Sequence, residues 1–408
     1  MQRSLALLLL CLFAAGCASL TPQRTPPSVL LVSIDGMRAQ DLTLGLTPNL
    51  ARIARDGVQA DWMTPSYPTL TFPNHYTLVT GLRPDHHGIV HNWMHDPVLG
   101  TFRNSDAVAT SNGRWWSGEP IWVGAEKAGL PTAIMIWPGS EAAIGGVRPT
   151  RWTGYDARPT PAARVDTVLG WLSEPAATRP RFAALYFETY DGAAHDHGPD
   201  SPQARAAIAE LDAQLGRLLD GLAARGLDDT VNLIVVSDHG MATVTPERAL
   251  AMEDFVDPAD AKIVTAGQLV GIEPLPGREA VAEQHLLGRH PHHQCWRRAS
   301  VPTRWHYGTH PRVPAIICQM DEGWTLQPRA RIGEVVSGTT SGAHGYDPTL
   351  PSMRAIFFAR GPAFRAGTRL HGFDNVDVYP LLARLLAIPP APNDGDPATW
   401  TPVLTAPR

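Results

Sequence analysis

Five short runs of apolar and β-branched residues, spread along the chain and separated by helical patterns, constrain the fold most strongly. The runs are Val29–Ile34, Thr132–Trp137, Phe182–Phe187, Val231–Val236 and Arg354–Ala359. Continuous apolar runs of this length are typical of strands buried on both faces, as in parallel sheets. Their alternation with helices predicts an α/β fold with a largely parallel central sheet flanked by helices.

The predicted helices lie between these strands and carry recognisable end signals. Thr47 precedes the helix Pro48–Asp56 as its N-cap, and Gly57 follows it, which are the residue types that helix ends prefer. A short helix is expected to begin near Pro73 and end at Gly81, with Thr71 close to its N-cap. The other predicted helices are Pro120–Ala128, Ala162–Leu172, Ser201–Arg225 and Asp374–Ala387.

One α/β core interrupted by a lobe is the predicted organisation. A chain of 408 residues, 44% of them hydrophobic, is long enough for a large domain with an insertion. Segment 243–341 is rich in Pro, His, Arg and Trp and lacks the alternation of strands and helices. We therefore expect an inserted lobe there, between core segments 29–242 and 342–408, the second of which ends in a Pro-rich tail.

The first 17 residues predict export. Arg3 precedes the apolar run Leu5–Ala15, which is too short to span a bilayer but has the length of a secretory signal. The run ends in Ala14-Ala15-Gly16-Cys17, which resembles a bacterial lipobox with lipid on Cys17, and cleavage after Ala18 is the alternative. We expect a periplasmic protein, soluble or lipid-anchored at Cys17, with a Thr/Pro linker over residues 18–28.

The net charge argues against a nucleic-acid partner, and the cysteines bear on the redox state of the compartment. The formal net charge of −5 offers no basic field for a nucleic-acid partner. Of four cysteines, Cys11 lies in the signal and Cys17 is the candidate lipid site. Cys295 and Cys318 remain, and in an oxidising compartment a disulfide between them is the default expectation. The nearby cluster His290-Pro291-His292-His293 could bind metal, but a solvated loop is the preferred interpretation.

Acidic residues and histidines gather where the predicted strands end, which is where open α/β sheets place their active sites. These residues are Asp35, Asp191, His195, Asp238, His239 and His344. Each alone has an ordinary explanation as a turn or core residue, but the convergence of six is hard to explain in that way. Three aspartates and three histidines would supply mixed oxygen and nitrogen ligands for two sites, which suits zinc better than magnesium or calcium.

Thr71 lies where such a site would need a nucleophile. A pair of metal ions can hold the attacking and leaving oxygens of a phosphoryl transfer. The helix that Pro73 starts would direct its positive end at an arriving phosphate. A helix-capping role is the ordinary explanation of Thr71, but next to metal ions its hydroxyl could be activated for attack. We therefore predict that Thr71 is the nucleophile.

Seven motifs in this order resemble the nucleotide pyrophosphatase/phosphodiesterase family of the alkaline phosphatase superfamily, and its bacterial members in particular. The most specific pair is Thr71-Phe72-Pro73-Asn74-His75 with Ser237-Asp238-His239-Gly240-Met241. The others are residues 32–38, 85–92, 137–140, 191–195 and 342–345. The resemblance covers the chain from Val29 to about Asp394 and implies an alkaline phosphatase-like fold.

The resemblance also implies a complete set of site residues. One zinc ion would be held by Asp191, His195 and His344. The second would be held by Asp35, Asp238 and His239, with the Thr71 oxygen also on that ion. Asn92 would donate to a nonbridging phosphate oxygen. The pocket for the nucleoside would be lined by Phe72, Tyr155 and Tyr186.

These residues together predict an exported two-zinc hydrolase of nucleotide diesters or pyrophosphates. It would act through a covalent phosphothreonine and release a nucleoside 5′-monophosphate. An alkaline phosphatase-like monoesterase and a phospholipid-cleaving diesterase are the alternatives, and an inactive lipid-anchored binding protein is a remote one. A guanidinium of Arg148 or Arg151 reaching the phosphate would favour monoesters. A sulfatase is disfavoured because the Thr71 motif lacks the arginine that sulfatases carry there.

Overall fold

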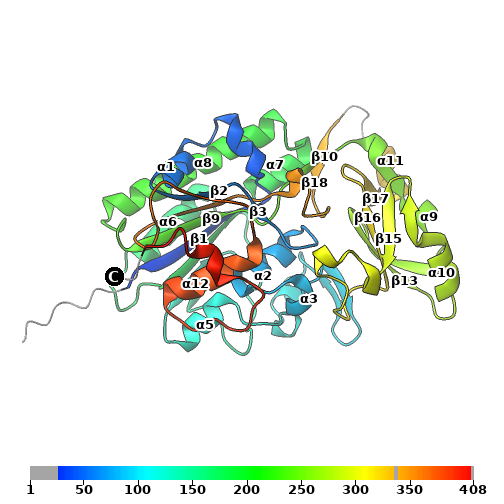
Figure 1. Ribbon diagram of the computed structural model, residues 1–408, viewed down its shortest axis with the longest axis horizontal. Coiled ribbons are helices and arrows are strands. Elements are labelled where there is room, and N and C mark those ends of the chain that lie inside the picture. The colour runs from blue at the N-terminus through cyan, green and yellow to red at the C-terminus, as the bar shows by residue number, and fades with distance from the viewer. Residues whose placement is uncertain (1–25, 335–338, 406–408) are drawn as a thin grey trace, which may run out of the picture.

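An eight-stranded sheet forms the centre of the computed structural model, which describes residues 26–334 and 339–405 (Figure 1). The predicted signal, the lipid site Cys17 and most of the linker lie outside the described residues. The strand order is β20-β2-β19-β9-β1-β8-β6-β7. The strands are β1 (Ser28–Ile34), β2 (Gly57–Ala60), β6 (Thr132–Met135), β7 (Arg151–Thr153), β8 (Phe182–Phe187), β9 (Val231–Val236), β19 (Phe357–Arg360) and β20 (Thr368–Leu370).

The prediction of a largely parallel α/β sheet is confirmed. β1 pairs in parallel with β8 and β9, and β6 pairs in parallel with β8 and β7. β19 is the exception, because it runs antiparallel to both β9 and β2. It also begins later than the predicted run Arg354–Ala359, since Ala355 forms isolated bridges to Arg38 and Met63 before the strand starts.

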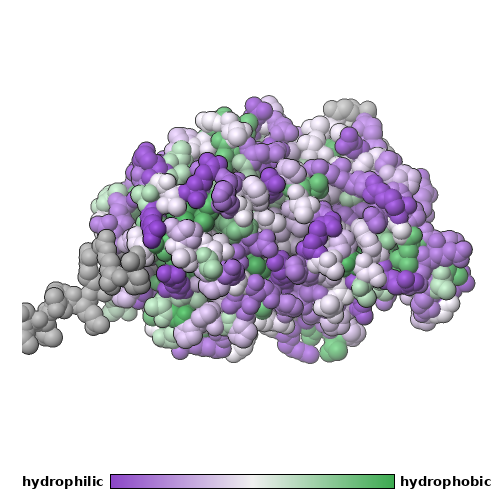
Figure 2. All heavy atoms as spheres, viewed as in Figure 1, coloured by the Kyte–Doolittle hydropathy of each residue, from purple (hydrophilic) through white to green (hydrophobic). Residues whose placement is uncertain are grey.

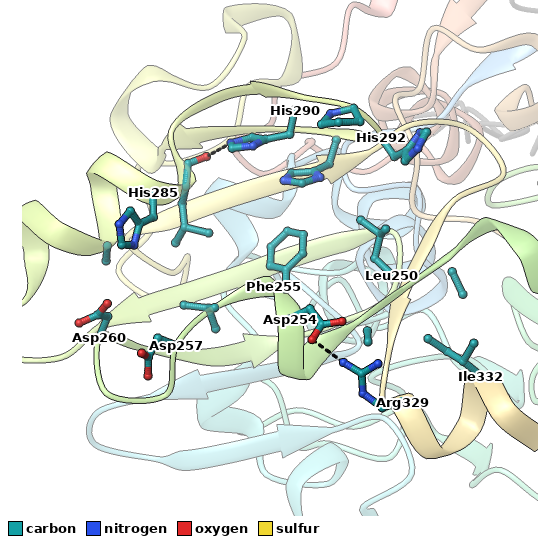
Figure 3. Close-up of a pocket in the computed structure, with 17 residues that line it drawn as sticks. Leu250, Asp254, Phe255, Asp257, Asp260, His285, His290, His292, Arg329 and Ile332 are labelled. Atoms are coloured by element: carbon teal, nitrogen blue, oxygen red, sulfur yellow. Dashed lines mark hydrogen bonds and ion pairs between the residues drawn. The ribbon is translucent and has the colours of Figure 1, made fainter.

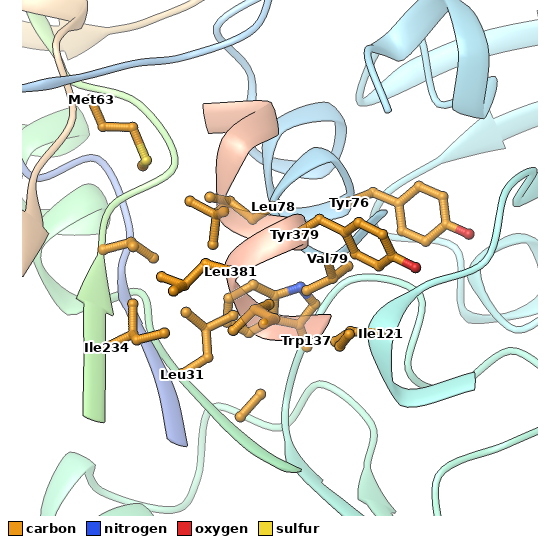
Figure 4. Close-up of a cluster of buried hydrophobic side chains, with 14 of the residues drawn as sticks. Leu31, Met63, Tyr76, Leu78, Val79, Ile121, Trp137, Ile234, Tyr379 and Leu381 are labelled. Carbon is orange, nitrogen blue, oxygen red and sulfur yellow. The ribbon is translucent and has the colours of Figure 1, made fainter. Parts of the chain in front are cut away.

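Helices cover both faces of this sheet and bury every side chain of β1. Val29 and Leu31 pack in one core with residues of α2 and α12, which Figure 4 shows around Leu31, Leu78 and Leu381. Leu30 and Val32 pack in the other core with α1, α6 and α8. The helices are α1 (Pro48–Arg55), α2 (Thr71–Thr80), α5 (Ile121–Lys127), α6 (Pro161–Leu172), α7 (Thr189–His197), α8 (Pro202–Ala224) and α12 (Val378–Leu386).

A second, antiparallel sheet lies beside the first, at the right of Figure 1. Its order is β12-β13-β16-β15-β14, and we call the described residues 245–334 and 339–340 the small-sheet region. The strands β10 (Ala242–Val244) and β18 (Ser341–Ala343) pair with each other where the chain leaves and re-enters the core. The five strands are β12 (Ala261–Thr265), β13 (Leu269–Pro274), β14 (Gly288–His290), β15 (His293–Arg297) and β16 (Ile316–Met320), with α10 (Glu279–Leu286) beside them. The division at 243 and 341 stays a prediction.

The disulfide prediction is confirmed, because Cys295 and Cys318 are bonded. They lie opposite each other on β15 and β16, and both side chains are buried. The bond therefore joins two central strands of the small sheet.

The remaining α-helices and strands are short. They are β3 (Met63–Thr64), β4 (Trp93–Asp96), β5 (Gly100–Arg103), β11 (Ala249–Ala251), β17 (Thr325–Gln327), β21 (Phe373–Asp374), α3 (Pro84–His87), α4 (Ala107–Thr110), α9 (Met252–Phe255) and α11 (Arg329–Glu334). The face in Figure 2 is mainly hydrophilic, with hydrophobic residues scattered over it. Among the described residues, no helix has both the length and the apolar character that crossing a bilayer requires.

Candidate active site

Three aspartates meet at the carboxyl ends of three adjacent strands. Asp35 follows β1, Asp191 lies in α7 just after β8, and Asp238 follows β9. Because β1 lies between β8 and β9 and is parallel to both, the three chain segments leave the sheet side by side. Gly36 makes the turn after β1 with φ +72°, and a Cβ there would lie 3.0 Å from an Asp191 oxygen. A glycine is thus needed both for the turn and for the close approach.

The first predicted ligand set is brought together. Asp191 and His195 lie one turn apart on α7, with His195 Nε2 3.5 Å from Asp191 Oδ1. His344, just after β18, places its Nε2 3.7 Å from the same oxygen. The candidate ligand atoms of these three residues lie within 4.8 Å of one another.

The second predicted set lies directly beside the first. His239 Nε2 is 2.9 Å from Asp238 Oδ2 and 3.5 Å from Asp35 Oδ1. The His239 ring stacks on the His344 ring with centroids 3.7 Å apart, so the two sets share one pocket of donors. Asp35, Asp238 and His239 are all buried.

Backbone carbonyls fix the orientation of all three histidines. The Nδ1 atoms of His195, His239 and His344 lie 2.8–2.9 Å from the carbonyl oxygens of Gly342, Gly240 and Thr69. A carbonyl only accepts, so each Nδ1 carries a proton, and in the neutral form of the ring Nε2 then presents a lone pair. His344 Nε2 and His195 Nε2 face each other at 3.1 Å. Two lone pairs at that distance repel unless a cation or a proton lies between them.

The carboxylates show the same need for a cation. Asp35 Oδ1 and Asp191 Oδ1 are buried without a hydrogen-bond partner, and the contacts of Asp238 Oδ2 are to the His239 and His75 rings. Burial and the neighbouring carboxylates Asp238 and Asp191 raise the pKa of Asp35 well above its usual range. Burial also raises the pKa of Asp191. Buried, unpartnered oxygens cost free energy, and a metal ion would satisfy them, so the donors present fit metal binding.

Thr71 lies beside this cluster, at the start of α2. The sequence placed it near the N-cap, whereas Leu70 is the N-cap and Thr71 is the first helical residue. The shift arises because Asn74 N–H donates to Leu70 O at 3.1 Å and so starts the helix one residue earlier than a Thr71 cap would. The Thr71 hydroxyl lies 3.3 Å from His239 Nε2. It therefore faces the candidate ligands instead of capping the helix.

Asn92 lies within reach of the same helix end. Its Oδ1 accepts a hydrogen bond of 2.9 Å from the Phe72 backbone N–H. This bond orients the amide, because the oxygen is used and the NH₂ group is then directed elsewhere as a donor. The donor role expected for Asn92 is compatible with this orientation.

The three expected pocket aromatics lie in different surroundings. Phe72 is half-buried against Phe102 and Trp116, whereas the side chain of Tyr155 is exposed. Tyr186 differs from the expectation of a pocket wall, because it is buried and its hydroxyl donates to Asp35 Oδ2 at 2.5 Å. The Tyr186 hydroxyl is therefore directed inward, where it hydrogen-bonds the candidate ligand Asp35. A contact between Tyr186 and the nucleoside stays a prediction.

Arg148 and Arg151 have partners away from the candidate ligands. Arg148 donates to the Glu141 carbonyl and lies over the Trp152 ring. Arg151, on edge strand β7, forms an ion pair of 2.7 Å with Glu174. Neither arrangement brings a guanidinium to Thr71, which removes the reason that the sequence offered for a monoesterase.

His75 is a site residue that the sequence analysis did not single out. Its ring is fully buried and lies 2.9 Å from Ser33 Oγ, 2.9 Å from Thr71 O and 3.2 Å from Asp238 Oδ2. It therefore connects β1, the start of α2 and a candidate ligand. Its position four residues after Thr71, within one motif, was the available signal, since such residues lie on one helix face.

The histidines on the β14–β15 hairpin lie far from this arrangement, at a cavity of about 780 Å³ in the small-sheet region (Figure 3). His290 stacks on His293 at 4.5 Å, and His292 stacks on Trp324. His293 is buried, so the hairpin is not the wholly solvated loop that we expected. Among the residues that the structure describes, the only groupings with metal-ligand spacing are those around Asp35 and Asp191.

A threonine hydroxyl beside clustered carboxylates and imidazoles, at the carboxyl edge of a mainly parallel sheet, is an arrangement typical of metal-assisted hydrolases. The family described as type I phosphodiesterase / nucleotide pyrophosphatase matches residues 29–347. The chain belongs to this family and is a hydrolase.

Known relatives resemble the chain over most of its length. It is 36% identical to an uncharacterised pyrophosphatase/phosphodiesterase of Schizosaccharomyces pombe, over 90% of this chain and 78% of that protein. It is 35% identical to a bis(5′-adenosyl)-triphosphatase of Xenopus laevis, over 90% of this chain and 80% of that protein. Against the rat ectonucleotide pyrophosphatase/phosphodiesterase family member 3, it is 36% identical and spans 46% of that protein.

A solved structure confirms the fold class. An inactive threonine-to-alanine variant of murine ectonucleotide pyrophosphatase/phosphodiesterase 5, in complex with AMP, superposes with a TM-score of 0.87 at 33% identity. The match covers 93% of this chain and all of that one. These relatives are eukaryotic, so the expected affinity to bacterial members stays a prediction.

Proposed function

We propose that this chain is a two-zinc phosphodiesterase that hydrolyses nucleotide diesters or pyrophosphates and releases a nucleoside 5′-monophosphate. The observation that carries the proposal is the Thr71 hydroxyl beside two adjoining sets of carboxylate and imidazole donors, with the histidine Nε2 atoms directed at one another. The murine relative that was solved with AMP, and whose threonine-to-alanine variant is described as inactive, supports both the ligand class and a threonine nucleophile.

The donor types favour zinc over the harder divalent ions. Asp191, His195 and His344 would hold one ion, and Asp35, Asp238, His239 and the Thr71 oxygen the other. Imidazole nitrogens are common zinc ligands, whereas calcium and magnesium prefer oxygen alone. When bound, the ions would lower the pKa of the threonine hydroxyl and stabilise the charge on the attacking and leaving oxygens.

The residues of the chain suggest a two-step displacement. Thr71 Oγ1 attacks the phosphorus, its proton passes to solvent or to the leaving group, and the alcohol or phosphate departs as a nucleotidyl-threonine ester forms. Water then attacks the phosphorus of that ester, which restores the threonine hydroxyl and releases the nucleoside 5′-monophosphate. Thr71 begins α2, so the positive helix end faces the phosphate in both steps. The Asn92 amide would donate to a nonbridging oxygen.

A diester suits these surroundings better than a monoester dianion. Asn92 is neutral, and the two arginines that might have reached the phosphate pair elsewhere. Phe72 and Tyr155 would instead offer faces on which a nucleobase could stack. A monoester dianion carries one more charge, which this set of donors does not match.

Export is a separate part of the proposal. It rests on the signal pattern in residues 1–17 and on the oxidising compartment that the Cys295–Cys318 bond needs. Anchoring through lipid on Cys17 would be the only membrane attachment. Mass spectrometry of the protein isolated from its host would distinguish lipidated Cys17 from cleavage after Ala18.

A substrate comparison with metal analysis tests the catalytic proposal. We expect about two zinc ions per chain. We also expect kcat/KM for the p-nitrophenyl ester of thymidine 5′-monophosphate to exceed that for p-nitrophenyl phosphate at least a hundredfold, about 2.7 kcal/mol of differential transition-state binding. Equal or inverted efficiencies would make the protein a monoesterase. Preferred cleavage of choline phospholipids would make it a phospholipid diesterase, and no hydrolysis of any of these would leave a binding protein.

A further inference from the structure

Tyr155 lies on a loop that buries none of its residues fully. The loop joins β7, the edge strand of the large sheet, to α6, and residues 154–160 are all half-buried or exposed. The Tyr155 side chain is 64% exposed. Burial and the nearby carboxylates Glu188 and Asp35 raise its pKa. An exposed aromatic ring on such a loop needs something to hold its backbone.

Arg164, in the first turn of α6, supplies that support. It is only 2% exposed, and its guanidinium donates to two carbonyls of the loop, Pro159 O at 3.1 Å and Asp156 O at 3.2 Å. On its other side it donates to Tyr186 O, at the end of β8, at 3.0 Å. It also binds both oxygens of Glu188, at 2.5 and 2.7 Å.

These bonds join the loop to the end of β8, just before the helix α7 that carries the candidate ligand Asp191. Glu188 stands three residues before Asp191, and Tyr186 is the residue whose hydroxyl binds Asp35. A guanidinium has a rigid, planar set of donors, so five bonds in two directions fix the distance between the groups that it joins. A lysine could not span the same acceptors. Glu188 compensates the charge of the buried guanidinium.

We propose that Arg164 is a positioning residue for substrate specificity, which holds the Tyr155 loop against the end of β8 so that Tyr155 can bind the nucleoside part of the substrate. This inference rests on the proposed function. Arg164 does not reach the reacting atoms in this arrangement. Its loss should therefore weaken the selection of nucleoside-bearing substrates more than it weakens the chemistry that all diesters share.

Two substrates with the same leaving group separate these effects. They are the p-nitrophenyl ester of thymidine 5′-monophosphate and methyl p-nitrophenyl phosphate, which has no nucleoside. The ratio of their kcat/KM values should fall about tenfold in Arg164→Met and in Tyr155→Ala, since stacking on one aromatic ring is worth roughly that factor. The double variant should fall no further than either single variant, because both act on the same contact. Zinc content should stay that of the wild type.

The loop offers a matched control. Arg158 also lies on it but is exposed and binds only Asp156, so Arg158→Met should keep the ratio. If Arg164→Met does not fold, Arg164→Lys and Glu188→Gln provide the test, and both should lower the ratio. An equal loss on the two substrates, or an unchanged ratio in a folded Arg164 variant, would overturn the proposal. A wild-type enzyme with no preference for the nucleotide ester would instead overturn the proposed function on which it rests.

Discussion

Histidines cluster in two regions of the molecule, and the rings are about equally close in both. His195 and His344 at the edge of the large sheet have centroids 5.0 Å apart, and His290 and His293 on the β14–β15 hairpin have centroids 4.5 Å apart. At the large sheet each Nδ1 donates to a carbonyl, and the Nε2 atoms converge with three carboxylates. On the hairpin the rings lie face to face in nearly parallel planes, and His290 Nε2 itself contacts the Leu286 carbonyl.

The difference shows that neighbouring groups, and not the number of histidines, decide what a cluster can do. When a carbonyl accepts a hydrogen bond from Nδ1, the Nε2 atom is free to bind a metal ion. When a carbonyl accepts from Nε2 instead, that nitrogen cannot act as a ligand. Burial and His290 lower the pKa of His293 to about 4, so His293 is neutral at pH 7 and packs as an aromatic ring against Phe255. The hairpin histidines therefore serve packing, and those at the sheet edge have the arrangement of ligands.

The largest effect is expected at Thr71, the proposed nucleophile of the site at the large sheet. Thr71→Ala should lower turnover at least about a thousandfold, on the order of 4 kcal/mol in barrier, while zinc content stays near normal because the other ligands remain. Steady-state kinetics with the nucleotide p-nitrophenyl ester and metal analysis on the same sample would measure both. Retention of more than a tenth of the activity would mean that water, and not Thr71, attacks the substrate.

The two clusters can be compared directly by equivalent substitutions. His344→Ala should lose one zinc ion and the activity that depends on it, because one of three protein ligands of that ion is removed. His293→Ala, the matched control, should keep the zinc content of the wild type. Metal analysis after dialysis against a weak chelator would measure this. Two tightly held ions in His344→Ala, or loss of an ion in His293→Ala, would reverse the assignment of the clusters.

Removing the disulfide should lower the stability of the small-sheet region and leave the candidate active site unchanged. Removing it in a Cys295→Ser/Cys318→Ser variant should cost about 3 kcal/mol of unfolding free energy in the chain-entropy model, since the bond joins β15 and β16 across 23 positions. Urea unfolding of the variant and of oxidised wild type would show the difference. Neither cysteine belongs to a candidate ligand group, so kcat/KM should change little, and a large loss of zinc would contradict the separation of the two regions.

The smallest effect is expected from Arg148 and Arg151, which the sequence left as possible contacts of the phosphate. Arg148→Ala and Arg151→Ala should each change the diester-to-monoester ratio less than about twofold, because both guanidinium groups pair with other residues. The same two-substrate assay with p-nitrophenyl phosphate measures this. A tenfold shift of the ratio in either variant would place that guanidinium at the phosphate after all.

Much of the architecture followed from local patterns. Apolar runs fixed four of the five predicted strands to within two residues, because strands buried on both faces need such runs. Parallel neighbours end at one edge, so the residues that follow β1, β8 and β9 had to lie close together. The disulfide could also be anticipated, since two cysteines remained outside the predicted signal and an oxidising compartment was expected.

Tertiary structure alone decided how those residues are used. Asn74 N–H pairs with the Leu70 carbonyl, and this moved Thr71 from the cap to the first helical position. Tyr186 turned inward because a buried carboxylate, Asp35, accepts its hydroxyl. Arg164 gained its role from acceptors on two separate segments, at Asp156 and Glu188. Each outcome depends on the direction of a hydrogen bond between residues brought together by folding, and a linear pattern of residue types carries no information on that direction.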